Sequence, residues 1–404
     1  MRKIRLHWQI LIALILSILF GIFFTDQVEY VSWMGDVFLR ALRMIIVPLI
    51  FSSIVSGVTG IGNSKNLGRM SAKTFGYYLT TSFFAIMTGL FMVNLLKPGK
   101  GADLGLSGVV EGLDVGAETF GQTLINIIPV NIIEAMATGD MLSIIFFAIL
   151  FGFFTTKVKP SFSKPIEKTF NAIFEVMMQL TMFVIRFTPL GIFGIVSKMV
   201  AEQSDNLLPV ISSMAVYMIA VIGALIIHAA ITLPVLVKFI GRSNPLKHLR
   251  CMSVPLLTAF STSSSNATLP LTLKAVEHNS GVSNETTGFV LPLGATINMD
   301  GTALYECVAA LFIAQAYGIE LTLLQQGIVV ITALLASIGA AGIPMAGLVI
   351  ITIILTAVGL PLEGVGLILA VDRILDMFRT TVNVWSDSCG AVIIARSEGE
   401  TLNV

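Results

Sequence analysis

The sequence has little charge, few cysteines and no excess of charge of one sign. Only 12% of its 404 residues are charged, whereas roughly a quarter are charged in a soluble domain. The formal net charge of +0 argues against nucleic acid as a partner. The three cysteines form no CxxC or Cys/His cluster, so neither a disulfide framework nor a zinc site is indicated. Because 55% of the residues are hydrophobic, the composition predicts an all-α, polytopic integral membrane protein.

Long apolar segments fill the first 240 residues. A membrane-spanning helix needs about 20 mostly apolar residues, and lysine and arginine gather before the first segment and after the second, fourth and sixth. The positive-inside rule therefore places the N-terminus in the cytoplasm and returns the chain there after six spans. The expected spans cover residues 7–25, 31–60, 74–97, 118–156 (with a break near Gly139–Asp140), 165–198 and 208–238.

Two later segments are apolar enough for a membrane but too broken to cross it. Polar residues interrupt the first at Ser261–Thr268, and the second is split at Ser337–Pro344. Irregular backbone at membrane depth is tolerated only against protein or a water-filled cavity, and paired broken segments point to a transporter's substrate site. We therefore expect re-entrant hairpins at 247–282 and 322–360, each followed by a helix, at 286–318 and 362–396, which suggests an inverted repeat.

The last helix carries a polar stripe. At 3.6 residues per turn, one face collects six side chains: Asp372, Asp376, Arg379, Thr380, Asn383 and Asp387. Charges within a span cost at least about 2.5 kcal/mol each, so the stripe faces protein, water, ions or substrate. One interpretation is internal salt bridges that only hold the bundle together. The other gives Arg379 to a carboxylate and Asp376 to an ammonium, which together fit an acidic amino acid.

The segment Asn298–Thr302 interrupts the helix expected at 286–318, and we expect the break at Gly301. It supplies oxygens from Asn298 and Asp300, together with freed backbone carbonyls, and Asp387 can join them. Such oxygens suit a hard cation such as Na⁺. A kinked helix with a buried aspartate is the alternative.

Four motifs in order along nearly the whole chain resemble the glutamate/aspartate transporter family, the dicarboxylate/amino acid:cation symporters. They are SSSNATLP at 263–270, GATINMDGT at 294–302, SIGAAGIP at 337–344 and DMFRTTVN at 376–383. The resemblance implies eight transmembrane helices, two re-entrant hairpins and a homotrimer. It also implies a static scaffold (residues 1–73 and 98–204) and a transport domain that moves as an elevator (74–97 and 205–404).

The family's site residues carry over onto matching positions. The implied substrate contacts are Ser264, Ser265, Thr302, Ile343, Gly347, Asp376, Arg379, Thr380 and Asn383. One implied sodium site uses Gly294, Asn298, Asn383 and Asp387; a second uses carbonyls of Thr296, Ser337, Ile338 and Ala340; a third uses Tyr78, Thr81, Ser82, Asn298 and Asp300. Without the resemblance, the helix-three residues would be interpreted as a packing face.

The chain departs from the family at the arginine that supports the substrate site. Ser263 stands at the hairpin tip and Met377 in the last helix, the two places where members carry it. Arg373 either compensates or caps a surface. Glu306 matches the proton-carrying glutamate of animal members, and its alternative is a glutamate neutralised by a nearby hydroxyl. Four scattered histidines are interpreted as interface or surface residues: His7, His228, His248 and His278.

We therefore expect a non-enzymatic symporter of L-aspartate or L-glutamate, driven by Na⁺, in a prokaryotic inner membrane with both termini cytoplasmic. A proton-coupled glutamate/aspartate or C4-dicarboxylate symporter on the same fold is the main alternative. Asp376 argues against a plain dicarboxylate, which brings no ammonium. A neutral amino acid exchanger would lack Arg379, and a channel would not need hairpins. A serine hydrolase has no G-x-S-x-G motif here.

Overall fold

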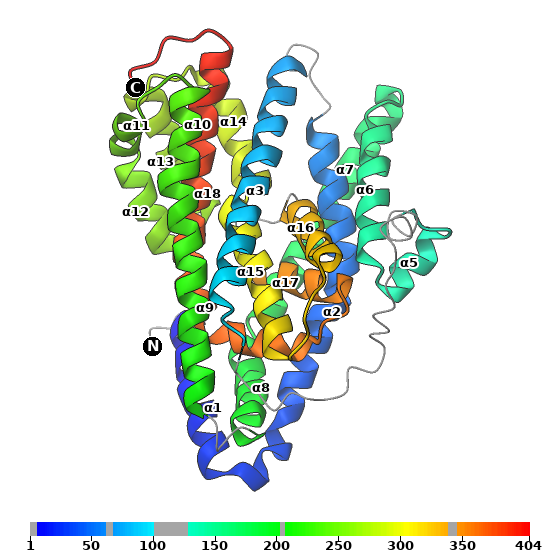
Figure 1. Cartoon of the computed structure of the whole chain (residues 1–404). Coiled ribbons are helices and arrows are strands. Elements are labelled where there is room, and N and C mark those ends of the chain that lie inside the picture. The colour runs from blue at the N-terminus through cyan, green and yellow to red at the C-terminus, as the bar shows by residue number, and fades with distance from the viewer. Residues whose placement is uncertain (1–5, 62–67, 101–127, 203–206, 338–345) are drawn as a thin grey trace, which may run out of the picture.

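A computed structural model of the chain is shown in Figure 1. It describes residues 6–61, 68–100, 128–202, 207–337 and 346–404. Within these ranges the chain forms helices joined by short loops and contains no strand. The expectation of an all-α protein is therefore confirmed for the described residues.

The first half of the chain follows the predicted segments closely. Its helices are α1 (Leu6–Phe23), α2 (Glu29–Ile61), α3 (Gly68–Leu96), α5 (Ile132–Thr138), α6 (Met141–Thr155), α7 (Pro160–Ile185) and α8 (Thr188–Glu202). The predicted break lies between α5 and α6, where Gly139 adopts a φ of 78° and Asp140 caps α6 by accepting from the Ser143 N–H. One prediction was wrong: the segment 165–198 is not one helix, because α7 and α8 meet at an angle of 51°.

The second half contains the two hairpins and the interrupted helix. Its elements are α9 (Leu207–Ile227), the π-helical turn η2 (His228–Thr232), α10 (Leu233–Phe239), α11 (Pro245–Cys251), α12 (Ser253–Thr262), α13 (Ser265–Lys274), η3 (Ala275–Asn279), α14 (Asn284–Ile297), α15 (Asp300–Ala316), α16 (Leu323–Ser337), α17 (Ala346–Ala357), η4 (Leu362–Gly364) and α18 (Val365–Ser397). The first hairpin turns at Ser263, whose φ of 50° is left-handed. The tip of the second, residues 338–345, lies outside the described residues.

Several helices are long and apolar enough to cross a membrane. Among the described residues, four pass on length and composition, or five if the bent pair α7–α8 counts as one span. They are Glu29–Thr59, Arg69–Leu96, Ile211–Phe239, Asn284–Ala316 and the pair Pro160–Ile185 with Thr188–Lys198. The long helix α18 is not among them, and it carries the charged stripe predicted above.

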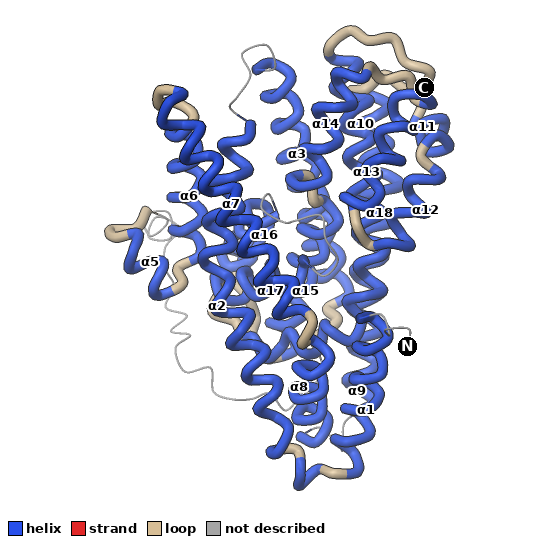
Figure 2. The backbone as a smooth tube through the Cα atoms, turned by 180° about the vertical axis from the view of Figure 1, so that it is seen from behind, coloured by secondary structure: helices blue, strands red, loops and turns tan. Residues whose placement is uncertain are grey.

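The helices pack in two groups. In the first, α2 contacts α6, α7 and α8, and α1 lies along α8. In the second, α15 lies between α3, α9, α16 and α18, while α12, α13 and α14 cover the far end of α18. Figure 2 shows α6 and α7 on one side of the molecule and α10 to α14 with α18 on the other. Contacts across the groups come from α17 against α2 and α6, and from α18 against α1 and α8.

The interrupted helix is the most enclosed part of the fold. Every residue of α15 from Asp300 to Ala314 is buried, and small residues allow its neighbours to approach. At Gly301, an added Cβ would meet the backbone carbonyl oxygen of Arg379 in α18. The break between α14 and α15 is thereby held directly against the charged stripe.

Candidate functional site

Four elements bring polar side chains together at the break between α14 and α15. The break itself spans Asn298 and Met299, and α3, η2 and α18 surround it. All the side chains described next are nearly or fully buried. Buried polar groups require partners, and here they find one another.

Asp300 is the centre of a compact oxygen cluster. Its Oδ1 accepts hydrogen bonds from Ser82 Oγ at 2.6 Å and Thr81 Oγ1 at 3.2 Å. Its Oδ2 accepts from Ser386 Oγ at 2.6 Å and lies 3.1 Å from His228 Nε2. A carboxylate at 0% exposure is thus surrounded by hydroxyls and one imidazole, all contributed by other helices.

Asn298 links this cluster to the second aspartate. Its amide Nδ2 donates to Asp387 Oδ1 at 2.9 Å and to Ser386 Oγ at 3.0 Å. Gly294 leaves the space that this requires, because an added Cβ would lie 2.5 Å from Asp387 Oδ1 and 3.0 Å from the Tyr78 hydroxyl. The Tyr78 hydroxyl itself donates to the Val290 carbonyl at 2.6 Å.

The structure therefore brings the predicted cation ligands of the first and third sites to one place. Seven of them converge there: Tyr78, Thr81, Ser82, Gly294, Asn298, Asp300 and Asp387. Carboxylate, amide and hydroxyl oxygens suit a hard cation. Among the described residues no group of three or more His, Cys, Asp or Glu side chains could hold a metal. The donor set thus fits Na⁺ better than a transition metal.

Arg379 lies on α18 about two turns before that cluster and is 1% exposed. Its Nε donates to Asp376 Oδ1 at 2.9 Å, and its Nη1 lies 3.2 Å from Asp372 Oδ1. The guanidinium stacks over the Tyr305 ring at 4.3 Å, and the Tyr305 hydroxyl donates to Asp372 Oδ1 at 2.7 Å. Two carboxylates and a ring face thus compensate a buried cation.

Asn383 joins the stripe to the helix break. Its Oδ1 accepts from the Gly301 backbone N–H at 2.7 Å, and its Nδ2 donates to Thr302 Oγ1 at 3.1 Å. Thr380 Oγ1 lies 3.5 Å from Asp376 Oδ1. The predicted substrate contacts on α15 and α18 are therefore neighbours in space.

Both hairpins contact α18. In the second, Gly347 lies so close to Arg379 that an added Cβ would meet the guanidinium. In the first, Phe260 packs edge-on against Phe378 at 5.2 Å, and Ser264 caps α13 by accepting from the Ala267 N–H at 3.2 Å. The predicted contact Ile343 lies outside the described residues.

Comparison with known proteins identifies the family. The family profile "Sodium:dicarboxylate symporter family" matches residues 6–397. This chain belongs to that family. The sodium:dicarboxylate symporters are transporters, not enzymes, and the chain is an integral membrane transporter. The predicted family membership is thereby confirmed.

Curated relatives cover the chain almost end to end. The chain is 34% identical to "Proton/glutamate-aspartate symporter" of Escherichia coli over 98% of its length and 93% of the relative. It is 35% identical to "Proton/sodium-glutamate symport protein" of Geobacillus stearothermophilus over 99% and 96%. It is 36% identical to "Excitatory amino acid transporter 1" of Ambystoma tigrinum over 91% and 77%.

The second predicted sodium site of this symporter lies only partly within the described residues. Of its predicted carbonyl ligands, that of Thr296 belongs to an exposed residue near the end of α14 and that of Ser337 to a buried residue at the end of α16. The other two predicted ligands, Ile338 and Ala340, lie outside the described residues. That site stays a prediction.

Two residues bear on the departures of this symporter from its family. The Ser263 hydroxyl at the hairpin tip is buried without a hydrogen bond in the described part of the chain. Arg373 Nη1 lies 3.6 Å from Asp376 Oδ2, so Arg373 neighbours the carboxylate that Arg379 also bonds.

Glu306 is fully buried, and neither of its carboxyl oxygens has a partner among the described residues. The neighbouring hydroxyl considered for Glu306 is therefore not found there.

Sequence reasoning missed two participants in this symporter's site, His228 and Ser386. His228 and His248 are fully buried, so their interpretation as interface or surface residues was wrong. His228 sits in the π turn η2, which directs it to Asp300. Such turns are frequent at functional sites, but no local sequence signal marked this one. For Ser386, the only indication in the sequence was its position directly before Asp387.

Proposed function

We propose that this protein is a secondary active symporter of L-aspartate or L-glutamate driven by a sodium gradient. The observation that carries the proposal is the adjacency of two buried sites on α15 and α18. One is the oxygen cluster around Asp300, and the other is the row around Arg379. The names of the bacterial relatives, which mention glutamate, aspartate, protons and sodium, support the same substrate class.

The substrate's side-chain carboxylate would replace existing partners of Arg379. The guanidinium already bonds Asp376 and faces Asp372, so an incoming carboxylate competes with these for a planar, fork-shaped donor. Asp376, once released, would face the substrate's ammonium, together with Thr380. Thr302 would assist Arg379. Asn383, Ser264 and Ser265 would hold the α-carboxylate, and Gly347 with Ile343 would close over it.

Coupling would follow from the shared helix break. Asn298 and Asp300 are proposed sodium ligands, and Thr302, two residues further on, is a proposed substrate contact. Asn383 bonds both the Gly301 backbone and Thr302, so a shift of the break moves both sites. Sodium bound at the oxygen cluster would fix the break in the arrangement that receives the substrate.

The transport cycle we propose is an elevator motion of residues 74–97 and 205–404 against a scaffold of residues 1–73 and 98–204. The separate packing of α1, α2, α7 and α8 supports this division. We further propose eight spans with two re-entrant hairpins, a homotrimer, a cell inner membrane location and cytoplasmic termini.

Proton coupling is the second candidate, and one observation favours it. Glu306 is fully buried with no partner for either carboxyl oxygen in the described region. An ionised carboxylate in such surroundings is costly, so Glu306 would carry a proton whenever it is enclosed. A symporter can use both ions, and we propose Na⁺ as the main coupling ion with H⁺ as the second.

Labelled aspartate uptake into proteoliposomes tests the proposal. Sodium and proton gradients are imposed separately, and we expect accumulation with an inward sodium gradient. The matched variant Arg379→Cys should abolish uptake of acidic substrates while the protein still inserts and purifies. Unchanged aspartate uptake by Arg379→Cys would refute the substrate assignment. Uptake driven by a proton gradient alone would refute sodium coupling and favour proton coupling.

A further inference from the structure

A pocket separate from the transport site lies where α3 and α15 end and α16 begins. Its volume is about 320 Å³. Its polar lining consists of Asn94, Lys97, Lys100, Gln315, Glu320 and Gln326. None of these residues belongs to the oxygen cluster or to the Arg379 row.

The end of α3 is built to place Lys97 at this pocket. Helix α3 stops at Leu96, and Lys97 takes a left-handed φ of 45° while its N–H donates to the Val93 carbonyl at 2.9 Å. Gly99 then packs against α15, where an added Cβ would lie 2.6 Å from the Ala316 nitrogen. The Gly99 N–H donates to Gln315 Oε1 at 3.1 Å. The loop carrying both lysines is therefore anchored to α15.

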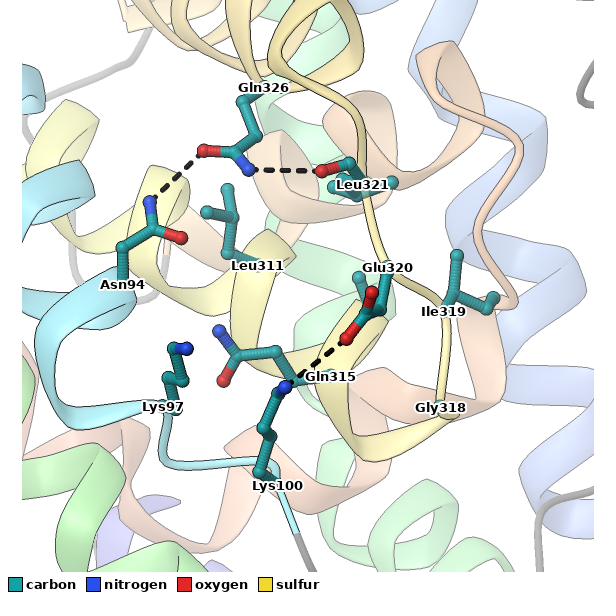
Figure 3. Close-up of a pocket in the computed structure, with 11 residues that line it drawn as sticks. Asn94, Lys97, Lys100, Leu311, Gln315, Gly318, Ile319, Glu320, Leu321 and Gln326 are labelled. Carbon is teal, nitrogen blue, oxygen red and sulfur yellow. Dashed lines mark hydrogen bonds and ion pairs between the residues drawn. The ribbon is translucent and has the colours of Figure 1, made fainter.

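The pocket has an uncompensated positive charge. Lys100 Nζ lies 3.1 Å from Glu320 Oε1, but both side chains are exposed, at 54% and 85%, so this pair is weak. Within the described residues, no carboxylate lies within ion-pair distance of Lys97. Figure 3 shows the Lys97 and Gln315 side chains extending into the same space, with Asn94 and Gln326 bonded above them. With two lysines and one glutamate, the lining carries a net positive charge, which favours an anion.

An apolar helix face leads directly to these lysines. On α3, Phe91 and Leu95 are 63% and 62% exposed, and this helix is long and apolar enough to span a membrane. A lipid chain lying along that face would bring its phosphate to the helix end. Basic pockets between transmembrane helices bind anionic lipid head groups on the cytoplasmic or matrix side. In the topology proposed above this end of α3 lies on the opposite side, where the same charge attraction would act on a lipid phosphate.

We propose that this pocket binds the head group of an anionic phospholipid. The phosphate would meet Lys97 and Lys100, the amide of Gln315 would donate to its oxygens or to the glycerol, and the acyl chains would cover Phe91 and Leu95. Because α16 is the first helix of the second hairpin, the lipid would bridge helix α3 and the hairpin that contacts Arg379. This site is independent of the substrate assignment.

The test uses the full chain in nanodiscs of phosphatidylcholine with or without phosphatidylglycerol. Native mass spectrometry counts the phosphatidylglycerol molecules that remain bound after release from the disc. We expect wild-type protein to retain phosphatidylglycerol over phosphatidylcholine. Each of Lys97→Gln and Lys100→Gln should weaken retention about fivefold, since one lysine near an anionic lipid surface contributes about 1 kcal/mol.

Lys198→Gln is the matched control, since Lys198 is an exposed lysine on α8, and it should retain phosphatidylglycerol like the wild type. Thermal unfolding in detergent checks that each variant is folded. Soluble glycerol phosphate and aspartate are added as competitors. Failure of both to displace the lipid supports a lipid site. Displacement by either at millimolar concentration would overturn it in favour of a small-anion site, and equal retention by the double variant Lys97→Gln/Lys100→Gln would overturn it outright.

Discussion

At the scale of single residues, glycines determine the shape of the site as much as its charged side chains do. Two glycines allow close contact with Arg379: an added Cβ at Gly347 would meet its guanidinium, and one at Gly301 would meet its backbone. The ion pair between Arg379 and Asp376 was the structural interpretation of the polar stripe. It is compatible with the functional one, because a buried binding arginine needs a partner when no substrate is present.

Gly294→Ala should weaken sodium binding. The new methyl would lie 2.5 Å from Asp387 Oδ1, so the carboxylate must move away from Asn298. Overpacking of this kind costs about 1–3 kcal/mol, which corresponds to a sodium affinity roughly five- to 150-fold weaker. The measurement is the sodium dependence of aspartate uptake.

Gly288→Ala is the control on the same helix, α14, because nothing lies within 4 Å of its added Cβ. We expect its sodium titration to match the wild type. Coincident titrations for Gly294→Ala and Gly288→Ala would contradict the assignment of Gly294 and Asp387 to a cation site.

At the scale of elements, hydropathy and turn residues predicted most helices, the Gly139 break and the interruption within Asn298–Thr302. These features follow from local composition. The break lies at Asn298 and Met299 and not at Gly301, which is inside α15. The re-entrant hairpins stay a prediction.

The π turn at His228 and the bend between Ile185 and Thr188 were missed. The bend has a local signal, Pro189, because a proline disfavours helical backbone in the residue before it. Residue spacing alone could not predict the full ligand sets, which came from the family resemblance. The structure brings most of the first and third sets together.

The segment after α18 ties the end of that helix to the start of α3. Glu398 accepts hydrogen bonds from Arg69 and, at 2.7 Å, from Lys73 Nζ. These bonds, led by the one from Arg69, hold the pKa of Glu398 below its ordinary value. A carboxyl with a lowered pKa adds stability above its unfolded-state pKa, near 4.5, and that contribution disappears as the pH falls through the folded-state pKa.

Glu398→Gln should therefore reduce the loss of thermal stability that the wild type shows as the pH is lowered. We expect its thermal midpoint to lie slightly below the wild type at pH 7, and the difference should shrink below about pH 4.5 and at high salt. Differential scanning fluorimetry of purified protein across this pH range measures it. Glu285→Gln, at an exposed glutamate of α14, should leave the profile unchanged. An unchanged profile for Glu398→Gln would mean that the pair adds no stability.

At the scale of the whole molecule, the two groups of helices meet through apolar contacts. Ile195 on α8 lies against Gly35 of α2 on one side and Gly366 of α18 on the other. Hydrophobic contact is non-directional, so such a surface allows one group to slide past the other. In Figure 1, α1, α2 and α8 extend beyond the ends of α3 and α15, and α9 of the second group reaches down beside α1 and α8.

A disulfide between positions 195 and 366 should stop transport. An added Cβ at Gly366 would lie 3.5 Å from the Ile195 Cβ, within the range of disulfide-bonded pairs. In a background with Cys251, Cys307 and Cys389 replaced, oxidation of Ile195→Cys/Gly366→Cys should abolish aspartate uptake and reduction should restore it. Ile195→Cys/Gly35→Cys places the bond within the scaffold, so its oxidation should leave uptake intact. If both oxidised variants transport normally, α8 and α18 do not move relative to each other, and the elevator motion is wrong.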